Sequence, residues 1–407
     1  MKEIEGGICA PKGFLASGIR CGIKTTATKR DLALVYSQQP CTSAAVFTAN
    51  VVQAASVIVS REHNKAGQVR ALITSSGNAN ACTGQAGLEA AHSITKMTAE
   101  LLKITKEETA IASTGVIGVP LPVAAIEKGI AELVAGLAPD GADAALEAIM
   151  TTDIRKKYTA VEFELPGKTS PVRIGAMTKG SGMIHPNMAT MICVITTDAA
   201  ISAAMLDKAL RRAVNRSFNR LTVDGDMSTN DIALIMANGA AGNSPVNEAG
   251  PAWEAFAMAL ETVCIKLARA MARDGEGATR LITVTVSGAA SEDAAAVLAR
   301  SVAGSSLVKA ACFGADANWG RVLCAMGYAG IPFRLEETSV EFASSAGTLP
   351  VFRNGEALPF SEETAKRILM EEEIIINAIA GNGTGTASAW GCDLTYDYVK
   401  INGDYRS

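Results

Sequence analysis

The stretch KGSGMIHPNMATMICVITTDAA, residues 179–200, runs from a loop into a segment with the composition of a buried strand. Its second half, MICVITTDA, is rich in Val, Ile and Thr, whose side chains fit a pleated and half-buried surface. Its first half contains glycine, serine, proline and asparagine, which are typical of turns. Thr190 stands at the junction, directly after the small residue Ala189.

The same alternation continues along the chain in both directions. Short runs rich in Val, Ile and Thr alternate with Ala-rich amphipathic runs, a pattern typical of a mixed α/β protein. Short turns connect strand to strand directly within residues 158–180 and 345–359, which indicates largely antiparallel sheets packed with helices. We therefore expect an α/β fold of the α+β kind, with strands at 70–76, 109–114, 191–199 and 279–289 and helices at 87–104, 123–137, 202–218 and 252–272.

Composition narrows the class of protein. The 407 residues, 48% of them hydrophobic, allow one large domain or two to three smaller ones. The net charge is −4 and no basic block occurs, so nucleic acid is not an expected partner. No apolar run approaches the roughly 20 residues of a membrane span. The N-terminal residues MKEIEGGICAPKGF carry acids where a signal peptide would be basic, so a cytoplasmic protein is expected.

The nine cysteines are widely spaced and mostly flanked by small or apolar residues. An odd number without a CxxC pair predicts reduced, buried thiols rather than disulfides. The three histidines are far apart in the sequence, so neither a metal site nor a cofactor is expected.

Thr190 is the first candidate for chemistry. A threonine hydroxyl becomes a useful nucleophile beside a base, and the α-amino group of the same residue can serve, with a pKa of about 7.7 to 8.0. That base exists only after a chain break between Ala189 and Thr190, which the hydroxyl could itself cause by attacking the preceding carbonyl. The alternative is that Thr190 is an ordinary β-branched residue at the start of a strand.

Three further stretches combine glycine with polar residues. In ASTGVIG, residues 112–118, Thr114 and Gly115 could form an oxyanion hole, or simply a turn after a strand. In SSGNANACTG, residues 75–84, the composition favours capping of the following helix over anion binding. TVDGDMSTND, residues 222–231, suggests a metal loop at first sight but lacks the EF-hand spacing.

A carboxylate stands between two glycines in RDGEGATR, residues 273–280. This carboxylate, Glu276, could meet the ammonium group of a substrate. The alternative is an acid in a solvated turn.

Taken in order, these stretches resemble one family, the ornithine acetyltransferases of arginine biosynthesis, also called glutamate N-acetyltransferases. The resemblance covers essentially the whole chain and is carried by GGICAPKGFLASGI, SGNANACTG, STGVIG, TTD, KGSGMIHPNMATM, TVDGDMSTND, RDGEGAT, NWGRVLCAMGYAG and YVKINGDYRS. It implies a sandwich of helices around two sheets, similar to N-terminal-nucleophile hydrolases but with a different connectivity.

The resemblance also implies the reaction. The precursor would cleave itself at Ala189–Thr190 into an α chain, 1–189, and a β chain, 190–407, which together form one catalytic unit and an α2β2 heterotetramer. Thr190 would take the acetyl group from N2-acetylornithine and pass it to glutamate by a ping-pong mechanism. Acetyl-CoA is a further candidate acetyl donor, as a substrate rather than a cofactor, and no short stretch decides whether it is used.

Site residues carry over from the family's motifs position by position. Thr114 and Gly115 would form the oxyanion hole, and the substrate contacts would be one threonine of the pair Thr151 and Thr152 together with Lys179, Thr190, Glu276, Asn402 and Ser407. Lys179 suits a carboxylate and Glu276 an ammonium group. Two positions depart from the family's pattern, since Ser407 and Met227 each stand where a threonine is usual.

Two rival functions use the same residues differently. A self-cleaving aminopeptidase of related fold would resolve the acyl-enzyme with water instead of glutamate. A non-enzymatic binding or assembly protein would remain uncleaved.

Overall fold

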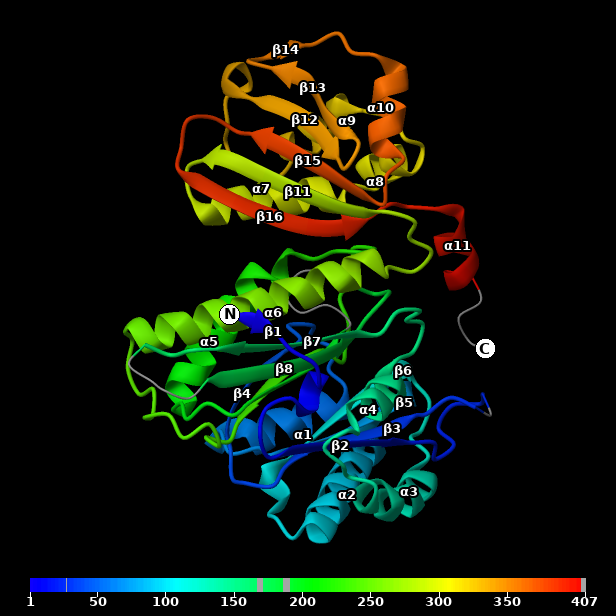
Figure 1. Ribbon diagram of the computed structural model, residues 1–407. Coiled ribbons are helices and arrows are strands. Elements are labelled where there is room, and N and C mark those ends of the chain that lie inside the picture. The colour runs from blue at the N-terminus through cyan, green and yellow to red at the C-terminus, as the bar shows by residue number, and fades with distance from the viewer. Residues whose placement is uncertain (27, 167–170, 186–190, 404–407) are drawn as a thin grey trace. The chain divides into compact units, whose positions relative to one another are not determined.

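The computed structural model describes residues 1–407 except 27, 167–170, 186–190 and 404–407. The chain forms two compact units (Figure 1), each described here by itself. Unit 1 comprises residues 1–180, 187–218 and 227–267, and unit 2 comprises 181–186, 219–226 and 268–407. The units therefore do not follow the division into 1–189 and 190–407, which remains a prediction about chain cleavage.

Unit 1 contains a six-stranded sheet, sheet A, in the order β1-β7-β8-β9-β10-β4. Its strands are β1 (Lys2–Glu3), β7 (Lys157–Phe163), β8 (Val172–Lys179), β9 (Ile192–Thr197), β10 (Ile232–Ala237) and β4 (Thr42–Phe47). Only β9 and β10 pair in parallel, and every residue of both is buried. Burial of both faces explains why their sequences are continuous apolar runs instead of alternating ones.

Sheet B of unit 1 has four strands in the order β2-β3-β5-β6. They are β2 (Phe14–Ile19), β3 (Leu32–Ser37), β5 (Ala71–Asn78) and β6 (Thr109–Val116), and only β5 and β6 pair in parallel. Alternate residues of β3 enter two cores. Ala33 and Val35 face residues of sheet A, and Leu32 and Leu34 face helices.

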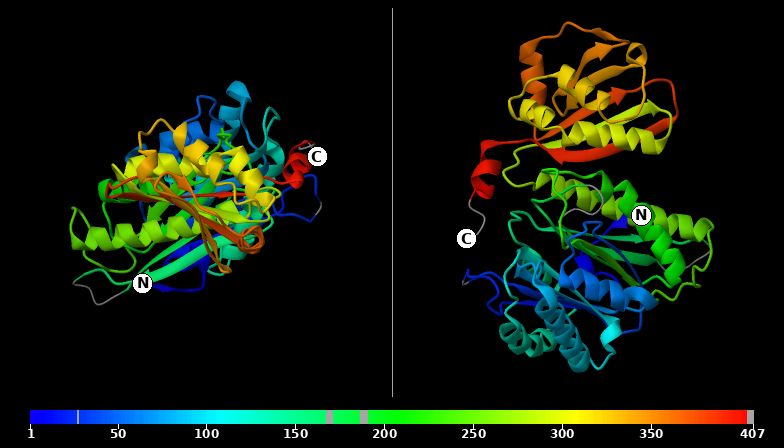
Figure 2. Two further views of the ribbon diagram at one scale, coloured as in Figure 1. Left: turned by 90° about the horizontal axis from the view of Figure 1, so that it is seen from above. Right: turned by 180° about the vertical axis from the view of Figure 1, so that it is seen from behind.

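Helices complete the layers of unit 1. α2 (Gly84–Leu102) and α3 (Val123–Ala135) lie on one face of sheet B (Figures 1 and 2). α4 (Ala142–Ile149) packs on β2 and β3 and shares the core between the two sheets. The remaining helices are α1 (Ala55–His63), beside β6, α5 (Ala203–Arg216), beside β4, and α6 (Pro251–Arg273), which runs on into unit 2.

Unit 2 contains the third sheet, in the order β14-β13-β12-β15-β11-β16. Its strands are β11 (Leu281–Ala289), β12 (Ser339–Ser344), β13 (Gly347–Arg353), β14 (Glu356–Ala357), β15 (Glu373–Ile379) and β16 (Gly385–Cys392). One face carries the apolar core, and the helices that pack near it (Figure 2) are α7 (Glu292–Gly304), α8 (Ser306–Phe313), α9 (Trp319–Gly327) and α10 (Glu362–Leu369). The short helix α11 (Tyr396–Asn402) follows β16.

The α/β class with largely antiparallel sheets is confirmed, as are the helices and strands expected from periodicity. Unit 1 contains the two expected sheets. The sheet of unit 2 is a third one, which was not predicted from the sequence. All nine cysteines are free. Cys9 and Cys21 are only partly buried, and Cys82 and Cys324 are exposed, so the expectation of burial was wrong for these four.

Among the described residues, no single helix combines the length and apolar composition needed to cross a membrane. The bent pair α7 and α8, with 57° between its helices, meets those two criteria together.

A fully buried carboxylate shapes the loop after β2. Asp31 accepts hydrogen bonds from the backbone N–H groups of Cys21, Gly22, Ile23 and Lys24, at 2.6, 3.0, 2.7 and 3.1 Å. Four donors on one carboxylate offset the cost of burying its charge.

We expect Asp31→Asn to destabilise unit 1, because the amide keeps only one accepting oxygen for four donors. The expected loss is about 2 to 4 kcal/mol in the free energy of unfolding, measured by urea unfolding followed by circular dichroism. Asp207→Asn is the control, because this carboxylate is 40% exposed and pairs with the nearby Arg211. Equal losses in the two variants would show that the Asp31 bonds contribute no more than a surface ion pair.

Candidate active site

The predicted oxyanion residues lie at the end of β6, the edge strand of sheet B. Gly115 has a φ of +135° and sits opposite Gly77 of β5. A Cβ atom on Gly115 would lie 2.3 Å from the Gly77 carbonyl carbon and 2.5 Å from the Asn78 nitrogen. Glycine is therefore required at this turn by both its backbone conformation and the close approach of β5.

The free edge of β6 presents backbone groups of alternate residues. The Ile111 N–H donates to the Ser60 hydroxyl at 2.7 Å, and the Ile111 carbonyl accepts from the same hydroxyl at 2.6 Å. The Ser113 carbonyl accepts from Asn230 Nδ2 at 2.7 Å. Because backbone groups alternate in direction along a strand, we expect the Gly115 N–H on this same edge. Thr114, between Ser113 and Gly115 in the chain, is buried.

The strand that follows Thr190 is held at its first residues. Asp231 is fully buried, and its Oδ1 accepts the Met191 N–H at 2.9 Å. The Ile232 N–H donates to the Met191 carbonyl at 3.1 Å. Ala189 and Thr190 themselves lie outside the described residues, so the structure bears on the proposed nucleophile only through Met191, its covalent neighbour.

The carboxyl group of Asp231 has unusual surroundings. Burial raises its pKa well above the usual range, and the hydrogen bond from the Met191 N–H only partly opposes this effect. Its Oδ2 atom is buried and has no hydrogen-bond partner within the described part of the chain. The group therefore favours its neutral form, since an unpaired charge would be costly to bury.

Asn230 connects three of the stretches singled out from the sequence. Its Nδ2 donates to the Ala79 carbonyl at 2.6 Å and to the Ser113 carbonyl at 2.7 Å. Its Oδ1 accepts from the Thr229 hydroxyl at 2.5 Å. The segments 75–84, 112–118 and 222–231 therefore meet at one buried side chain.

The asparagines of residues 75–84 have a structural role, but contrary to the prediction from the sequence they do not cap the helix that follows. Thr83, which precedes α2, makes no side-chain cap hydrogen bond. Asn78 donates to the Val119 and Pro120 carbonyls, both at 3.1 Å, and Asn80 donates to the Gly87 carbonyl at 3.0 Å. The expected capping was wrong because these side chains cross-link neighbouring loops instead.

Lys179 and the Thr151–Thr152 pair are brought together by a residue to which the sequence gave no role. Asp153 accepts the Gly180 N–H at 2.7 Å, the Thr151 N–H at 2.9 Å and Lys157 Nζ at 2.6 Å. Burial alone would raise the pKa of this carboxyl. The nearby Lys179 and Lys157 ammonium groups, with the hydrogen bonds, lower it below its usual range.

A signal for Asp153 was present in the sequence. It ends the TTD motif, and Lys157 follows it by four residues. Only the fold shows that this pair is buried, with side-chain exposures of 0% and 1%.

Glu276 and Asn402 lie together in unit 2. Asn402 Nδ2 donates to Glu276 Oε2 at 2.8 Å, and the Glu276 N–H donates to the Ser181 carbonyl at 2.9 Å. A Cβ atom on Gly182 would lie 2.3 to 2.7 Å from the carboxylate atoms of Glu276, so only glycine leaves room for them. Ser407 lies outside the described residues.

Asp224 fixes the same segment from another side. It accepts hydrogen bonds from the Met183 and Ile184 N–H groups at 2.6 and 2.8 Å, and burial raises the pKa of its carboxyl.

The Met227 carbonyl accepts from Asn50 Nδ2 at 3.0 Å, and nothing in the structure explains why methionine replaces threonine there. The described residues contain no group of three or more His, Cys, Asp or Glu side chains arranged to hold a metal ion.

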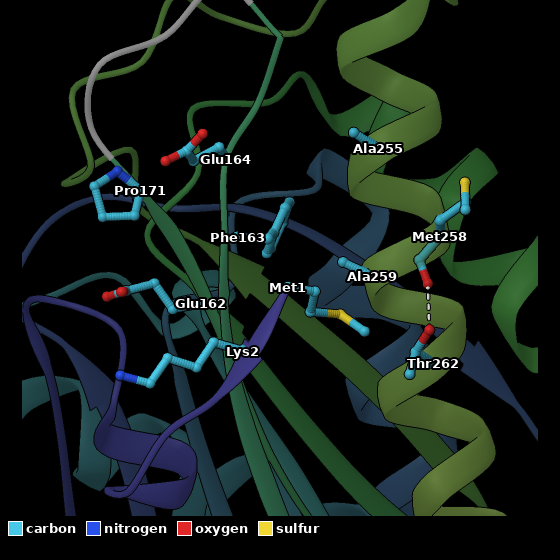
Figure 3. A pocket seen from close by; sticks show the side chains of 10 residues that line it. All are labelled: Met1, Lys2, Glu162, Phe163, Glu164, Pro171, Ala255, Met258, Ala259 and Thr262. Atoms are coloured by element: carbon cyan, nitrogen blue, oxygen red, sulfur yellow. Dashed lines mark hydrogen bonds between the residues drawn. The ribbon is translucent and has the colours of Figure 1, made fainter.

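A cavity of about 620 Å³ opens elsewhere in unit 1 (Figure 3). It is lined by the N-terminal residues Met1 and Lys2, by the end of β7 and by α6. None of the predicted substrate-binding residues that the structure describes lines it.

Comparison with known proteins agrees with the resemblance. The profile of the ArgJ family matches residues 15–407. The chain belongs to the ArgJ family. The arginine biosynthesis bifunctional protein ArgJ of Symbiobacterium thermophilum is 51% identical and that of Caldanaerobacter subterraneus 48%, with all of both chains covered in each case. The protein is accordingly an acyltransferase of arginine biosynthesis.

Two solved structures are also similar. The arginine biosynthesis bifunctional protein ArgJ of Bacillus halodurans is 45% identical, covers 51% of this chain and 96% of its own, and gives a TM-score of 0.48. The ornithine acetyltransferase of Mycobacterium tuberculosis, in complex with ornithine, is 34% identical, covers 47% of this chain and 99% of its own, and gives a TM-score of 0.42.

The Asp153 pair makes a pH-dependent contribution to the stability of this ArgJ protein. Because the pKa of Asp153 is lowered by folding, its contribution is present above the unfolded-state pKa of about 3.9 and is lost as the pH falls below it. Asp153→Asn should cost about 3 kcal/mol near pH 7, because it removes the negative charge that faces the buried ammonium groups. The difference from wild type should narrow between pH 5 and pH 3 in urea unfolding.

Asp143→Asn is the control for this prediction. Asp143 also binds a lysine, Lys156 at 2.6 Å, but its side chain is 65% exposed. An Asp153→Asn effect that is as small as this control, or independent of pH, would contradict the prediction.

Proposed function

We propose that this protein transfers an acetyl group from N2-acetylornithine to glutamate, with Thr190 as the acetyl carrier. The observation that carries the proposal lies within unit 1. Met191, the residue after Thr190, donates a hydrogen bond to Asp231. Asn230, which directly precedes Asp231 in the chain, donates a hydrogen bond to the carbonyl of Ser113, just before the proposed oxyanion residues. Membership of the ArgJ family over nearly the whole chain supports the same reaction.

We propose that Thr190 first releases its own amine. Its Oγ adds to the Ala189 carbonyl carbon, the C–N bond between the two residues breaks, and the nitrogen takes the hydroxyl proton. Water then hydrolyses the ester, which restores the hydroxyl and leaves Ala189 as a carboxylate. The α chain would be 1–189 and the β chain 190–407.

Acetyl transfer would follow in two steps, acetylation of Thr190 and then transfer of the acetyl group to glutamate. The α-amine of Thr190 takes the hydroxyl proton as the oxygen attacks the acetyl carbonyl, the amide C–N bond breaks, and ornithine leaves with that proton. The amine of glutamate then attacks the acetyl ester, the C–O bond breaks, and the threonine oxygen regains a proton. Thr114 and Gly115 would stabilise the oxyanion in both steps.

Substrate recognition is proposed for the charged and polar residues of the family's motifs. Lys179 would bind a substrate carboxylate and Glu276 an ammonium group, because both substrates are amino acids. Asn402 would orient the Glu276 carboxylate through the hydrogen bond that it donates. Thr151 or Thr152, and Ser407, would add further contacts.

The wider setting is proposed as well. The cleaved chains would assemble as an α2β2 heterotetramer in the cytoplasm. The reaction as written calls for no cofactor, and acetyl-CoA would act only as an alternative acetyl donor.

Intact-mass measurement of the purified protein tests self-cleavage. Wild type should give two fragments that meet at Ala189 and Thr190, and Thr190→Ala should stay whole because it lacks the attacking hydroxyl. After mixing with N2-acetylornithine, only the fragment beginning at Thr190 should gain an acetyl group.

Other outcomes would assign a different function. Uncut wild-type protein would indicate a binding protein. Cleaved protein whose acyl group is removed by water, with no acceleration by glutamate, would indicate the aminopeptidase reaction instead.

We expect Glu276→Lys to abolish the use of N2-acetylornithine, because an ammonium group would then face the substrate's ammonium group. Steady-state kinetics on protein that mass measurement shows to be cleaved would reveal this loss. Glu336→Lys is the control, since the same charge reversal falls on a side chain that is 75% exposed. Full activity in Glu276→Lys would remove Glu276 from the substrate site.

A further inference from the structure

Two consecutive side chains of unit 1, Asn230 and Asp231, contact the two elements on which the proposed acyl transfer depends. Asn230 binds the end of β6, where the oxyanion donors lie. Asp231 binds the first described residue after the nucleophile. The inference developed from these contacts rests on the proposed function and goes beyond it.

The orientation of the Asn230 amide is set by its neighbours. The side chain is 5% exposed, and both hydrogens of Nδ2 face carbonyl oxygens, those of Ala79 and Ser113. The amide oxygen faces the Thr229 hydroxyl, a donor. A flipped amide would place oxygen against two carbonyl oxygens, so only one orientation satisfies the buried groups.

The bond to Ser113 has a consequence for the oxyanion hole. Because a peptide unit is planar, fixing the Ser113 carbonyl also fixes the plane that it shares with the Thr114 nitrogen. Only the φ and ψ angles of Thr114 then separate this plane from the next one, which carries the Gly115 N–H. Asn230 therefore limits the direction in which the proposed oxyanion donor points.

Asp231 fixes the backbone just before β9. Its carboxyl accepts the Met191 N–H, and the following Ile232 N–H donates to the Met191 carbonyl. Met191 is therefore bound at both backbone groups. The Met191 nitrogen is bonded to the carbonyl carbon of Thr190, so one end of the proposed nucleophile is attached to a fixed point.

The two consecutive residues contact different sheets. Asn230 reaches β6 of sheet B, while Asp231 reaches the start of β9 in sheet A. A single peptide link between them couples the position of one element to that of the other.

We propose that Asn230 is a positioning residue, which with Asp231 sets the position of the proposed oxyanion donor of Gly115 relative to Met191, the residue that follows the proposed nucleophile in the chain. Loss of Asn230 then slows the chemical steps, self-cleavage and acetyl transfer, and leaves substrate affinity nearly unchanged. A misplacement of about 1 Å costs on the order of 100-fold in rate, and loss of an oxyanion donor about 100- to 1,000-fold. A reduction in kcat of about 10- to 100-fold is therefore expected for Asn230→Ala.

A matched control exists at the opposite end of β10. Asn238 directly follows that strand, is 9% exposed, and donates through Nδ2 to the Lys12 carbonyl at 2.9 Å and to the Ser37 hydroxyl at 3.2 Å. Asn238→Ala also removes the two hydrogen bonds that Nδ2 donates, one buried and one part-buried, but it does so away from the β6 turn and from Met191.

The experiment measures Tm, the rate of self-cleavage by intact mass, and kcat and KM per cleaved molecule for Asn230→Ala and Asn238→Ala. The expected result is a 10- to 100-fold lower kcat and slower cleavage for Asn230→Ala, with KM within about threefold of wild type. Asn238→Ala should keep kcat within about threefold. Equal losses in the two variants, or a kcat of Asn230→Ala within threefold of wild type, would overturn the proposal.

Asn230→Asp keeps the proposal testable if Asn230→Ala does not fold. An ionised carboxylate cannot donate to the Ala79 and Ser113 carbonyls, whereas a protonated one can donate to one of them. The kcat of this variant relative to wild type should therefore rise as the pH falls. A ratio that does not change with pH would argue against a positioning role.

Failure of this inference and failure of the proposed function give different results. If wild type is neither cleaved at Thr190 nor acetylated there, the proposed function fails whatever the Asn230 variants do. If wild type is cleaved and acetylated but Asn230→Ala behaves like Asn238→Ala, only the positioning role is lost.

Discussion

The parallel pairing of β9 with β10 is the constraint on which the site depends. The two strands run side by side from Ile192 opposite Ile232, and all of their residues are buried. Because parallel strands start at the same edge of a sheet, the residues before them, Met191 and Asp231, become neighbours. Two motifs that lie about 40 residues apart in the chain thus share one corner of unit 1. A one-residue slip in register would move Met191 away from Asp231 and separate this pair.

Buried carboxyl groups serve as organisers of backbone in several places. Asp31 binds four N–H groups, and Asp153 binds two N–H groups and an ammonium group. These contacts compensate for the cost of burying the charges, and removing either carboxylate is destabilising because its partners stay buried. Asp231 differs because it has one N–H donor, an oxygen that bonds to no described residue, and a raised pKa. A neutral carboxyl beside the proposed nucleophile adds no charge that would oppose a developing oxyanion.

Glycine provides the complementary kind of constraint, namely space. Gly115 is required because β5 approaches its Cα, and Gly182 is required because the Glu276 carboxylate occupies the place of a side chain. Both glycines belong to motifs that characterise the family resemblance, STGVIG and KGSGMIHPNMATM. Steric contacts in the structure thus explain why these two motif positions are glycine. It also shows why the neighbouring polar residues, Thr114 and Glu276, are found in fixed places.

Much of the architecture could be predicted from the sequence, because periodicity and turn residues act locally. The strands around 109–114 and 191–199 and the helix at 123–137 followed from pattern. The candidate residues Thr114, Gly115, Lys179 and Glu276 followed from pattern or resemblance, and their roles stay predictions. Pairing between distant segments is not encoded in local periodicity. The third sheet, the division into two units, the burial of Asp153 with Lys157 and the contacts of Asn230 and Asp231 therefore emerged only from the tertiary structure. An asparagine in a polar loop can cap a helix, face solvent or bind another strand, and only the packing of the chain decides among these.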